Sequence, residues 1–417
     1  MNDPISTAPA WTPAEVLAIQ KELFSLGLYR LDLDSRLGVG TSIALVEAFG
    51  GDAWRALPAS EIRRQLSEAK PPLGTRGEHR LRYGALCRDA LLDVTVGVGY
   101  DEAGSHLTLA PAIDTVLRQR GFAADNDAAM RVYARAQRPA LTGATGKLYV
   151  REGAFEYAPL VGAPRRVDAV VRVVVNEDGA AGGATAEAFR SALARADVSY
   201  YAGHGRFGSG PDFDPGMTLE LLDEKGAREG DAFTDADRFE EALAHEGATK
   251  GRNAWAQFLD RAAKGRVRVT GLNEGNIFLN PVNRHPTEFG GRLMYWNLTR
   301  PRAQGATLAT GPTGALATAA APLDYRVWVF DGCRTEDYLA SIRATPALSA
   351  KQVDVIVTKR LTYFNDKAPT LDAFLEGVLA QRSAEQIVAL MDARNATCRE
   401  PGAVIAADGL ADNPVIP

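Results

Sequence analysis

The chain has 417 residues, of which 46% are hydrophobic and 24% charged, so it is long enough to bury a substantial core. Its net charge of −5 gives no electrostatic case for a nucleic-acid partner. No apolar run approaches the roughly 18–20 residues that span a bilayer, and the N-terminus lacks the basic start and apolar stretch of a secretory signal. We therefore expect a cytoplasmic protein, or one exported without a cleaved signal peptide.

Cysteine is scarce in this sequence. Cys87, Cys333 and Cys398 are too few and too scattered for a disulfide framework. No C-x-x-C or H-x-x-x-H pair occurs, so we expect no structural zinc site. We also expect no other metal and no cofactor. Each cysteine is therefore interpreted either as a core residue or as a reactive group.

Residues 1–70 are predicted to form a small three-helix domain. In "TPAEVLAIQKELFSLGLY" the apolar residues recur at helical spacing, with Thr12 as the N-cap and Gly27 closing the helix. A second helix is predicted to begin with Thr41 as its cap, and a third follows at "PASEIRRQLSEA". The stretch 71–80, which contains two prolines and two glycines, is predicted to be a linker.

From residue 80 onward, strand-like and helix-like segments alternate, which is typical of an α/β fold with a mostly parallel sheet flanked by helices. Apolar, β-branched runs predict strands at 91–100, 167–175, 197–203, 326–330 and 353–358. Helical spacing predicts helices at 107–122, 235–247 and 253–265, and a helical pair at 370–393. We assign this domain to 81–398, with a long insertion at about 206–324 and a mobile tail at 399–417.

Two of the predicted strands end in glycine-containing loops that carry a reactive side chain. The stretch "YYAGHG" presents His204, and "VFDGC" presents Cys333. Ligands of open α/β sheets bind beyond the carboxyl ends of the strands, and neighbouring strands lie roughly 4.8 Å apart. If these two strands are neighbours, the imidazole favours the thiolate and can later protonate a leaving amine. The N–H groups of Gly205 and Cys333 could then form an oxyanion hole.

The order of these two motifs resembles the caspase-like (clan CD) cysteine peptidases over roughly residues 80–396. The strand end "GVGYDE", the strand 353–358 and the helical pair after it support the resemblance. The resemblance implies a cysteine endopeptidase, a hydrolase of peptide bonds, in which His204 is the general acid and base and Cys333 the nucleophile of a dyad. The interval between these two residues is longer than in a minimal domain of this family, which is why we predict the insertion.

The residue two positions before the cysteine, Asp331, matches an acid that lines the first specificity pocket of metacaspases. A buried carboxylate there would select a basic side chain, so the resemblance implies cleavage after Arg or Lys. The neighbouring Arg334 could neutralise this acid and remove the preference.

The N-terminal helices are similar to the peptidoglycan-binding-domain-like family. The resemblance implies a module that binds cell-wall glycan–peptide or a partner protein. The matching residues are Val16, Gln20, Leu23, Gly27, Leu28, Tyr29, Asp34, Leu37, Gly38, Thr41, Ala44 and Phe49.

Each reactive residue also has an ordinary structural interpretation. A lone cysteine near a strand end is more often a core residue than a nucleophile. The protein could therefore be a non-catalytic caspase-like scaffold or interaction protein, with its site occluded by the insertion, or an exported cell-wall-targeted effector. The peptidase hypothesis requires a protein or peptide substrate, and it predicts neither a nucleic-acid partner nor a membrane span.

Overall fold

The computed structural model describes most of the chain, but not all of it. The described residues are 10–72, 74–101, 104–139, 141, 146–177, 183–205, 211, 213, 218–233, 236–270, 288–289, 292–293, 309–310, 325–343 and 353–416. Among them, no helix is both long and apolar enough to cross a membrane.

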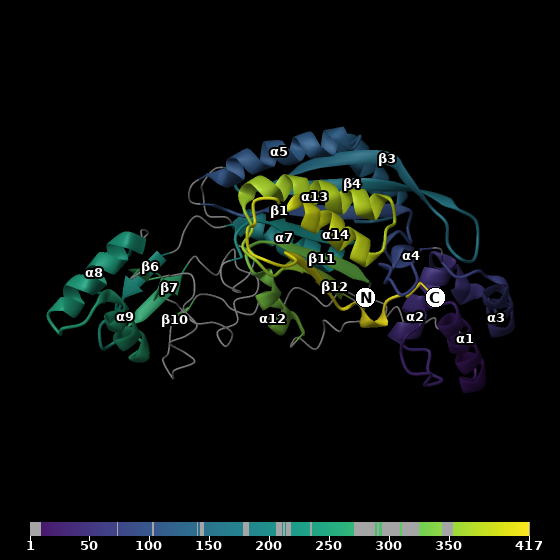
Figure 1. The fold of residues 1–417 in the computed structure, drawn as a ribbon, viewed down its shortest axis with the longest axis horizontal. Helices are drawn as coiled ribbons and strands as arrows, with labels where there is room; N and C mark the ends of the chain where they lie inside the picture. The colour runs from purple at the N-terminus through teal and green to yellow at the C-terminus, as the bar shows by residue number, and fades with distance from the viewer. Residues whose placement is uncertain are drawn as a thin grey trace.

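The centre of the molecule is an eight-stranded sheet (Figure 1). Its five central strands run parallel, and antiparallel strands extend it at both edges. The predicted α/β architecture, a mostly parallel sheet flanked by helices, is therefore confirmed. In spatial order the strands are β13 (Ile405–Asp408), β12 (Val353–Thr358), β11 (Arg326–Asp331), β5 (Val198–Ala202), β1 (Leu91–Val98), β4 (Arg165–Val175), β3 (Lys147–Tyr157) and β2 (Ala123–Ala124).

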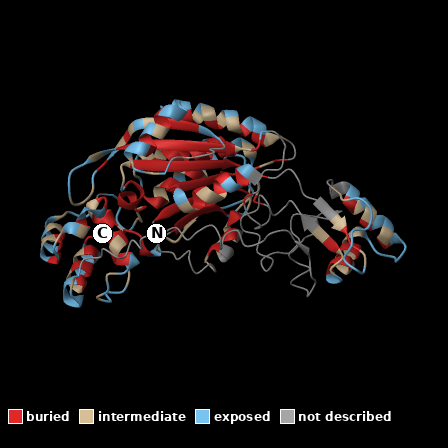
Figure 2. Cartoon of the chain, turned by 180° about the vertical axis from the view of Figure 1, so that it is seen from behind, coloured by how far each residue is buried: buried red, intermediate tan, exposed pale blue. Residues whose placement is uncertain are grey.

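The apolar runs of the sequence become the central strands because such strands are covered on both faces. Strands β1, β5, β11 and β12 are buried along their whole length, and Figure 2 shows the sheet in the colour of buried residues. Successive side chains of a strand point to opposite faces. Tyr200 and Tyr201 accordingly belong to two different hydrophobic clusters, one on each side of the sheet.

Helices cover both faces of the sheet. The cluster on the Tyr200 side is built with α5 (Ser105–Gln119), α13 (Phe364–Leu379) and α14 (Ala384–Arg394). The cluster on the Tyr201 side is built with α7 (Gly183–Arg195), η3 (Thr335–Tyr338) and α12 (Leu339–Arg343). A further helix, α6 (Asn126–Arg135), packs against β3.

The N-terminal region contains the three predicted helices and lies at one end of the sheet (Figure 1). The first helix begins as predicted, with Thr12 and Glu15 forming a reciprocal capping box. The second begins earlier than predicted, because Gly38 is its N-cap and Thr41 lies buried inside it. The elements are α1 (Pro13–Ser25), α2 (Val39–Phe49), η1 (Asp52–Ala56) and α3 (Ala59–Glu68).

These helices share one hydrophobic cluster with the central sheet. The N–H of Val161 donates to the carbonyl of Ala48 at 2.9 Å, which joins the segment after β3 to α2. The predicted linker 71–80 is also packed, since the N–H of Arg80 donates to the carbonyl of Pro414 at 2.7 Å. A short helix, α4 (Tyr83–Leu86), then leads into β1. The predicted boundary therefore does not coincide with a break in the packing.

The expected mobile tail at 399–417 is wrong for the described residues 399–416. Strand β13 pairs with β12, and the side chain of Asp392 accepts hydrogen bonds from the N–H groups of Val404 and Ile405. After the turn η4 (Leu410–Asp412), the N–H of Val415 donates to the carbonyl of Gly27 at 2.8 Å, and Ile416 is buried against Gly74 of the predicted linker. The pairing partner of this segment lies elsewhere in the sequence, so its local pattern did not reveal it.

The described part of the predicted insertion contains a small unit with its own hydrophobic cluster. Helices α8 (Ala236–Ala248) and α9 (Ala254–Ala263) form where the sequence predicts them and pack on a three-stranded sheet. The remainder of the predicted insertion lies outside the described residues. The strands of this region are β6 (Thr218–Leu221), β7 (Val267–Thr270), β10 (Ala309–Thr310) and the pair β8 (Glu288–Phe289) and β9 (Arg292–Leu293).

The buried carboxyl group of Asp354, which contacts the C-terminal segment, is expected to make the stability depend on pH. Burial raises the pKa of Asp354 on β12 to about 7, even though the Tyr325 hydroxyl and the Asn413 amide donate to its carboxylate. The folded protein therefore keeps a proton that the unfolded chain loses above its usual pKa of 3.8. This carboxyl group makes the free energy of unfolding fall as the pH rises from about 4 to about 7.

Replacing Asp354 with Asn removes the titration, so the variant should gain about 2–3 kcal/mol of stability relative to the parent between pH 5 and pH 8. Urea denaturation of both proteins at pH 5 and pH 8 measures this difference. Asp127→Asn, at an exposed aspartate on α6, is the control. An Asp354→Asn variant with the same pH response as the parent would contradict the assignment.

Candidate active site

The two strand ends predicted to carry the site are neighbours. Strands β5 and β11 pair in parallel, with Ala202 opposite Asp331, so His204 and Cys333 each follow at the same distance beyond the paired residues. The loops touch directly: a Cβ placed on Gly205 would lie 1.9 Å from the carbonyl oxygen of Cys333. The structure therefore brings the backbones of the two predicted catalytic residues side by side.

The imidazole of His204 is held by a carboxylate that the sequence analysis did not assign. Its Nε2 lies 2.8 Å from Oδ1 of Asp101, which follows β1, the other neighbour of β5. The side chain of His204 is 32% exposed and that of Asp101 is 10% exposed. The ring of Phe364, at the start of α13, meets the imidazole edge-on at a centroid distance of 5.2 Å. His204 is therefore oriented from two sides while it stays accessible.

Asp101 is kept ionised by its hydrogen bonds. Burial raises its pKa, but the hydrogen bonds from Ser105 and His204 outweigh burial and lower the pKa to about 2. The N–H of Ser105, in the first turn of α5, donates to Oδ2 at 2.9 Å. A fixed negative charge beside an imidazole favours the imidazolium form. The available signal for Asp101 was its place in "GVGYDE", just beyond the end of a third central strand.

The sulfur of Cys333 contacts the backbone of the loop after β12. The thiol donates to the carbonyl of Thr362 at 3.2 Å, and the N–H of Thr362 lies 3.4 Å from Sγ. Cys333 is partly exposed, unlike the fully buried Cys87. The next residue, Arg334, has a left-handed backbone (φ 51°), and its N–H donates to the carbonyl of Arg360 at 2.9 Å. This turn fixes the position of the cysteine.

Four neighbouring strands thus each contribute one residue to a single row. In the spatial order β12, β11, β5 and β1, the residues beyond the strand ends are Thr362, Cys333, His204 and Asp101. Parallel strands place all their carboxyl ends at the same edge, which is where ligands of α/β sheets bind.

The peptide after His204 has a defined orientation. The hydroxyl of Tyr201 donates to the carbonyl of His204 at 3.0 Å, and that of Tyr338 donates to the carbonyl of Gly205 at 2.9 Å. In a trans peptide the C=O and N–H point in opposite directions. The N–H of Gly205 therefore points away from the hydroxyl of Tyr201.

Asp331 is placed differently from the prediction. Its side chain is fully buried, Oδ1 lies 2.6 Å from Nζ of Lys367, and the hydroxyl of Tyr200 donates to Oδ2 at 3.1 Å. Arg334 does not neutralise it, because its guanidinium lies 3.7 Å from Glu400. Both oxygens of Asp331 are already engaged, so the structure argues against the predicted recognition of Arg or Lys by this acid. Lys367, the actual partner, was not identified from the sequence.

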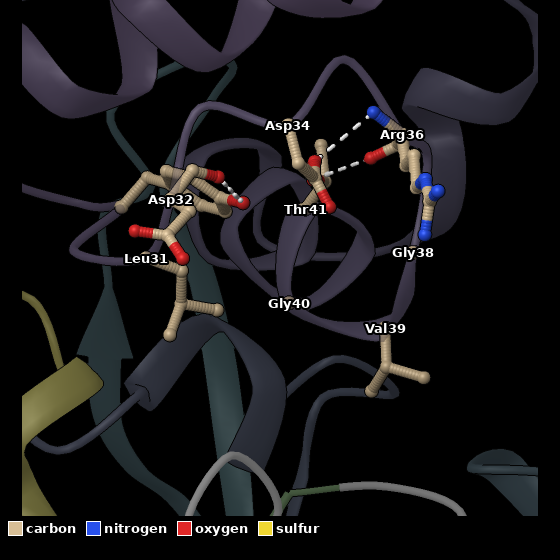
Figure 3. A pocket seen from close by; sticks show the side chains of 9 residues that line it. Leu31, Asp32, Asp34, Arg36, Gly38, Val39, Gly40 and Thr41 are labelled. Atoms are coloured by element: carbon tan, nitrogen blue, oxygen red, sulfur yellow. Dashed lines mark hydrogen bonds between the residues drawn. The ribbon is translucent and has the colours of Figure 1, made fainter.

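A separate pocket of about 160 Å³ lies in the N-terminal region (Figure 3). It is lined by Tyr29, Leu31, Asp32, Asp34, Arg36, Gly38, Val39, Gly40 and Thr41. The buried Gln20 organises its wall, because its amide donates to Asp34 at 2.9 Å and to Thr41 at 3.1 Å. Several residues that carry the N-terminal resemblance are thus interior residues. Their presence indicates a similar fold more directly than it indicates binding of a similar ligand.

Within the described ranges, no group of three or more His, Cys, Asp or Glu side chains could hold a metal ion. Comparison with known proteins found no family model that matches the chain, and no significant match among curated proteins or solved structures.

The close approach of the two loops predicts that even one methyl group is harmful there. Gly205→Ala would bring Cβ into the carbonyl of Cys333, and overpacking of this kind costs about 1–3 kcal/mol. We expect a lower free energy of unfolding in urea and an altered rate of Cys333 alkylation. Gly38→Ala should cost less, since its added Cβ meets no atom within 4 Å. Equal behaviour of the two variants would show that the loops are not in contact.

Proposed function

We propose that this protein is a caspase-like cysteine endopeptidase. The observation that carries the proposal is the row of strand-end residues in which His204 is held by Asp101 and lies beside the loop of Cys333. The predicted dyad is extended by this contact, so that Asp101 becomes a third member that orients the imidazole.

The chemistry follows from these positions. With Nε2 directed to Asp101, His204 uses Nδ1 to accept the proton of the Cys333 thiol, and the resulting thiolate attacks the carbonyl carbon of the peptide bond. The N–H groups of Gly205 and Cys333 stabilise the negative oxygen of the tetrahedral intermediate. The imidazolium then protonates the leaving amine, and a thioester remains. Water, deprotonated by the same imidazole, hydrolyses the thioester and regenerates the thiol.

Thr362 contributes on the far side of the sulfur. Its N–H is directed at Sγ and would stabilise a thiolate, whereas its carbonyl accepts the S–H of the neutral thiol. Transfer of the proton to His204 therefore requires rotation of the thiol hydrogen from Thr362 towards the imidazole.

The N-terminal helices are proposed as an attachment module for the peptidase, of the kind that binds cell-wall glycan–peptide or a partner protein. Their shared core with the sheet means that the module and the peptidase would move as one packed body. A protein with this arrangement acts on substrates near its attachment point, either in the cytoplasm or, for an exported effector, at a cell wall.

Cys333→Ala is expected to abolish peptide cleavage and to leave the urea denaturation curve nearly unchanged, because the sulfur is partly exposed and its loss leaves only a small cavity. Cleavage of a mixture of fluorogenic peptides measures the activity. Cys398→Ala, at another partly buried cysteine, should remain active.

An active Cys333→Ala protein would refute the peptidase. If the parent protein neither cleaves peptides nor reacts rapidly with a thiol-directed peptide electrophile, the non-catalytic scaffold would be the better interpretation.

Asp101→Asn keeps the shape of the side chain but removes the charge that holds the imidazolium. We expect kcat to fall by up to about 10⁴-fold, the size of the equivalent change in a serine-protease triad. Asp372→Asn, which breaks an ion pair between α13 and Arg120 at the end of α5, is the matched control and should retain kcat. A kcat within a factor of three of the parent would exclude Asp101 from the mechanism.

A further inference from the structure

Among the described residues near the candidate site, the ion pair between Asp331 and Lys367 is the most completely buried pair of opposite charges. The two side chains are 0% and 1% exposed, with 2.6 Å between carboxylate and ammonium. Burial raises the pKa of the Tyr200 hydroxyl well above its usual value, so this group remains a hydrogen-bond donor to the same carboxylate. A charge in such surroundings is stable only when it is paired.

The position of the ammonium is as informative as its burial. Nζ of Lys367 also donates to the hydroxyl of Thr362, the residue whose backbone contacts the sulfur of Cys333. The ammonium of Lys367 therefore contacts a residue, Thr362, that itself contacts the proposed nucleophile Cys333. It reaches this place from the first turns of α13 and binds an acid two residues before the cysteine. If Asp331 recognised a basic residue of the substrate, that side chain would have to bind the carboxylate that Lys367 already occupies.

The accessible surroundings of Cys333 do not favour a cation either. Leu361 and Tyr363, on both sides of Thr362, are 40% and 44% exposed and are among the largest exposed apolar side chains. The exposed Lys359, in the same loop after β12, adds a positive charge, while Arg334 is paired with Glu400 at 3.7 Å. A basic substrate side chain would gain little from these groups, whereas an apolar one would bury surface against Leu361 and Tyr363.

We propose that Lys367 is a built-in replacement for the basic side chain of a substrate. It occupies the carboxylate of Asp331 permanently, so the enzyme cleaves next to uncharged, apolar side chains and rejects arginine and lysine. This inference rests on the proposed peptidase function. It assigns Lys367 as a specificity-determining residue and makes Asp331 a latent cation site.

The first test needs no catalysis. Lys367→Ala exposes the latent site, and n-butylammonium, which has the length of a lysine side chain, should bind in place of the missing amine. We expect the melting temperature of Lys367→Ala to rise by about 2 °C or more at a cation concentration ten times its dissociation constant, and that of the parent to stay constant.

The matched control is the double variant Asp331→Asn with Lys367→Ala, which lacks the acid and should not respond to n-butylammonium. If Lys367→Ala folds only when the cation is present, the proposal is supported in the same way. If the cation does not stabilise the single variant more than the double variant, the latent cation site is refuted.

The second test measures cleavage of fluorogenic peptides that differ only in the residue before the cut. The parent should prefer Leu or Phe over Arg or Lys by about 10-fold or more, and Lys367→Ala should shift this ratio towards Arg and Lys by a similar factor. If the parent prefers basic or acidic residues, the proposed specificity is refuted, but the proposed peptidase activity is supported. A parent that cleaves no peptide refutes the peptidase and the specificity with it, and the n-butylammonium arm still decides whether Asp331 is a latent cation site.

Discussion

The parallel pairing of β5 with β11 is the interaction on which the candidate site depends. It brings together two loops that are far apart in the sequence. Because Ala202 lies opposite Asp331, both loops begin at the same position along the edge of the sheet. A slip of one residue in this register would displace one loop by about 3.3 Å and would turn every side chain of that strand to the other face. Glycine at 205 then lets the two backbones approach closely, since a Cβ there would collide with the carbonyl oxygen of Cys333.

The sheet also separates two kinds of support for the site. On the α7 side, the hydroxyls of Tyr201 and Tyr338 hold the backbone carbonyls of His204 and Gly205. On the α13 side, Tyr200 and Lys367 hold the carboxylate of Asp331. Two consecutive tyrosines thus stabilise the loops from opposite layers, and both hydroxyls are used inside the protein core. Burying these polar groups is tolerated because each has a hydrogen-bonding partner.

Local features of the sequence predicted the elements well. The buried strands were recognisable as apolar runs, and α1 begins at the predicted capping residue Thr12. Errors arose where the partner of a segment lies elsewhere in the chain. The C-terminal segment looked like a tail because β13 is short and gains its stability from β12, and the second helix was assigned to the wrong cap because Thr41 bonds inward to Gln20 and to the loop at Arg36.

The sequence by itself determined the buried central strands, several of the helices, and which reactive side chains follow the strand ends, because these properties depend on spacing between near neighbours. The tertiary structure decided which strands lie side by side, and therefore that His204 meets Asp101 and that Asp331 pairs with Lys367 instead of the adjacent Arg334. Charge pairing in a dry interior depends on position in space, and the order of strands in a sheet is not encoded in any local pattern.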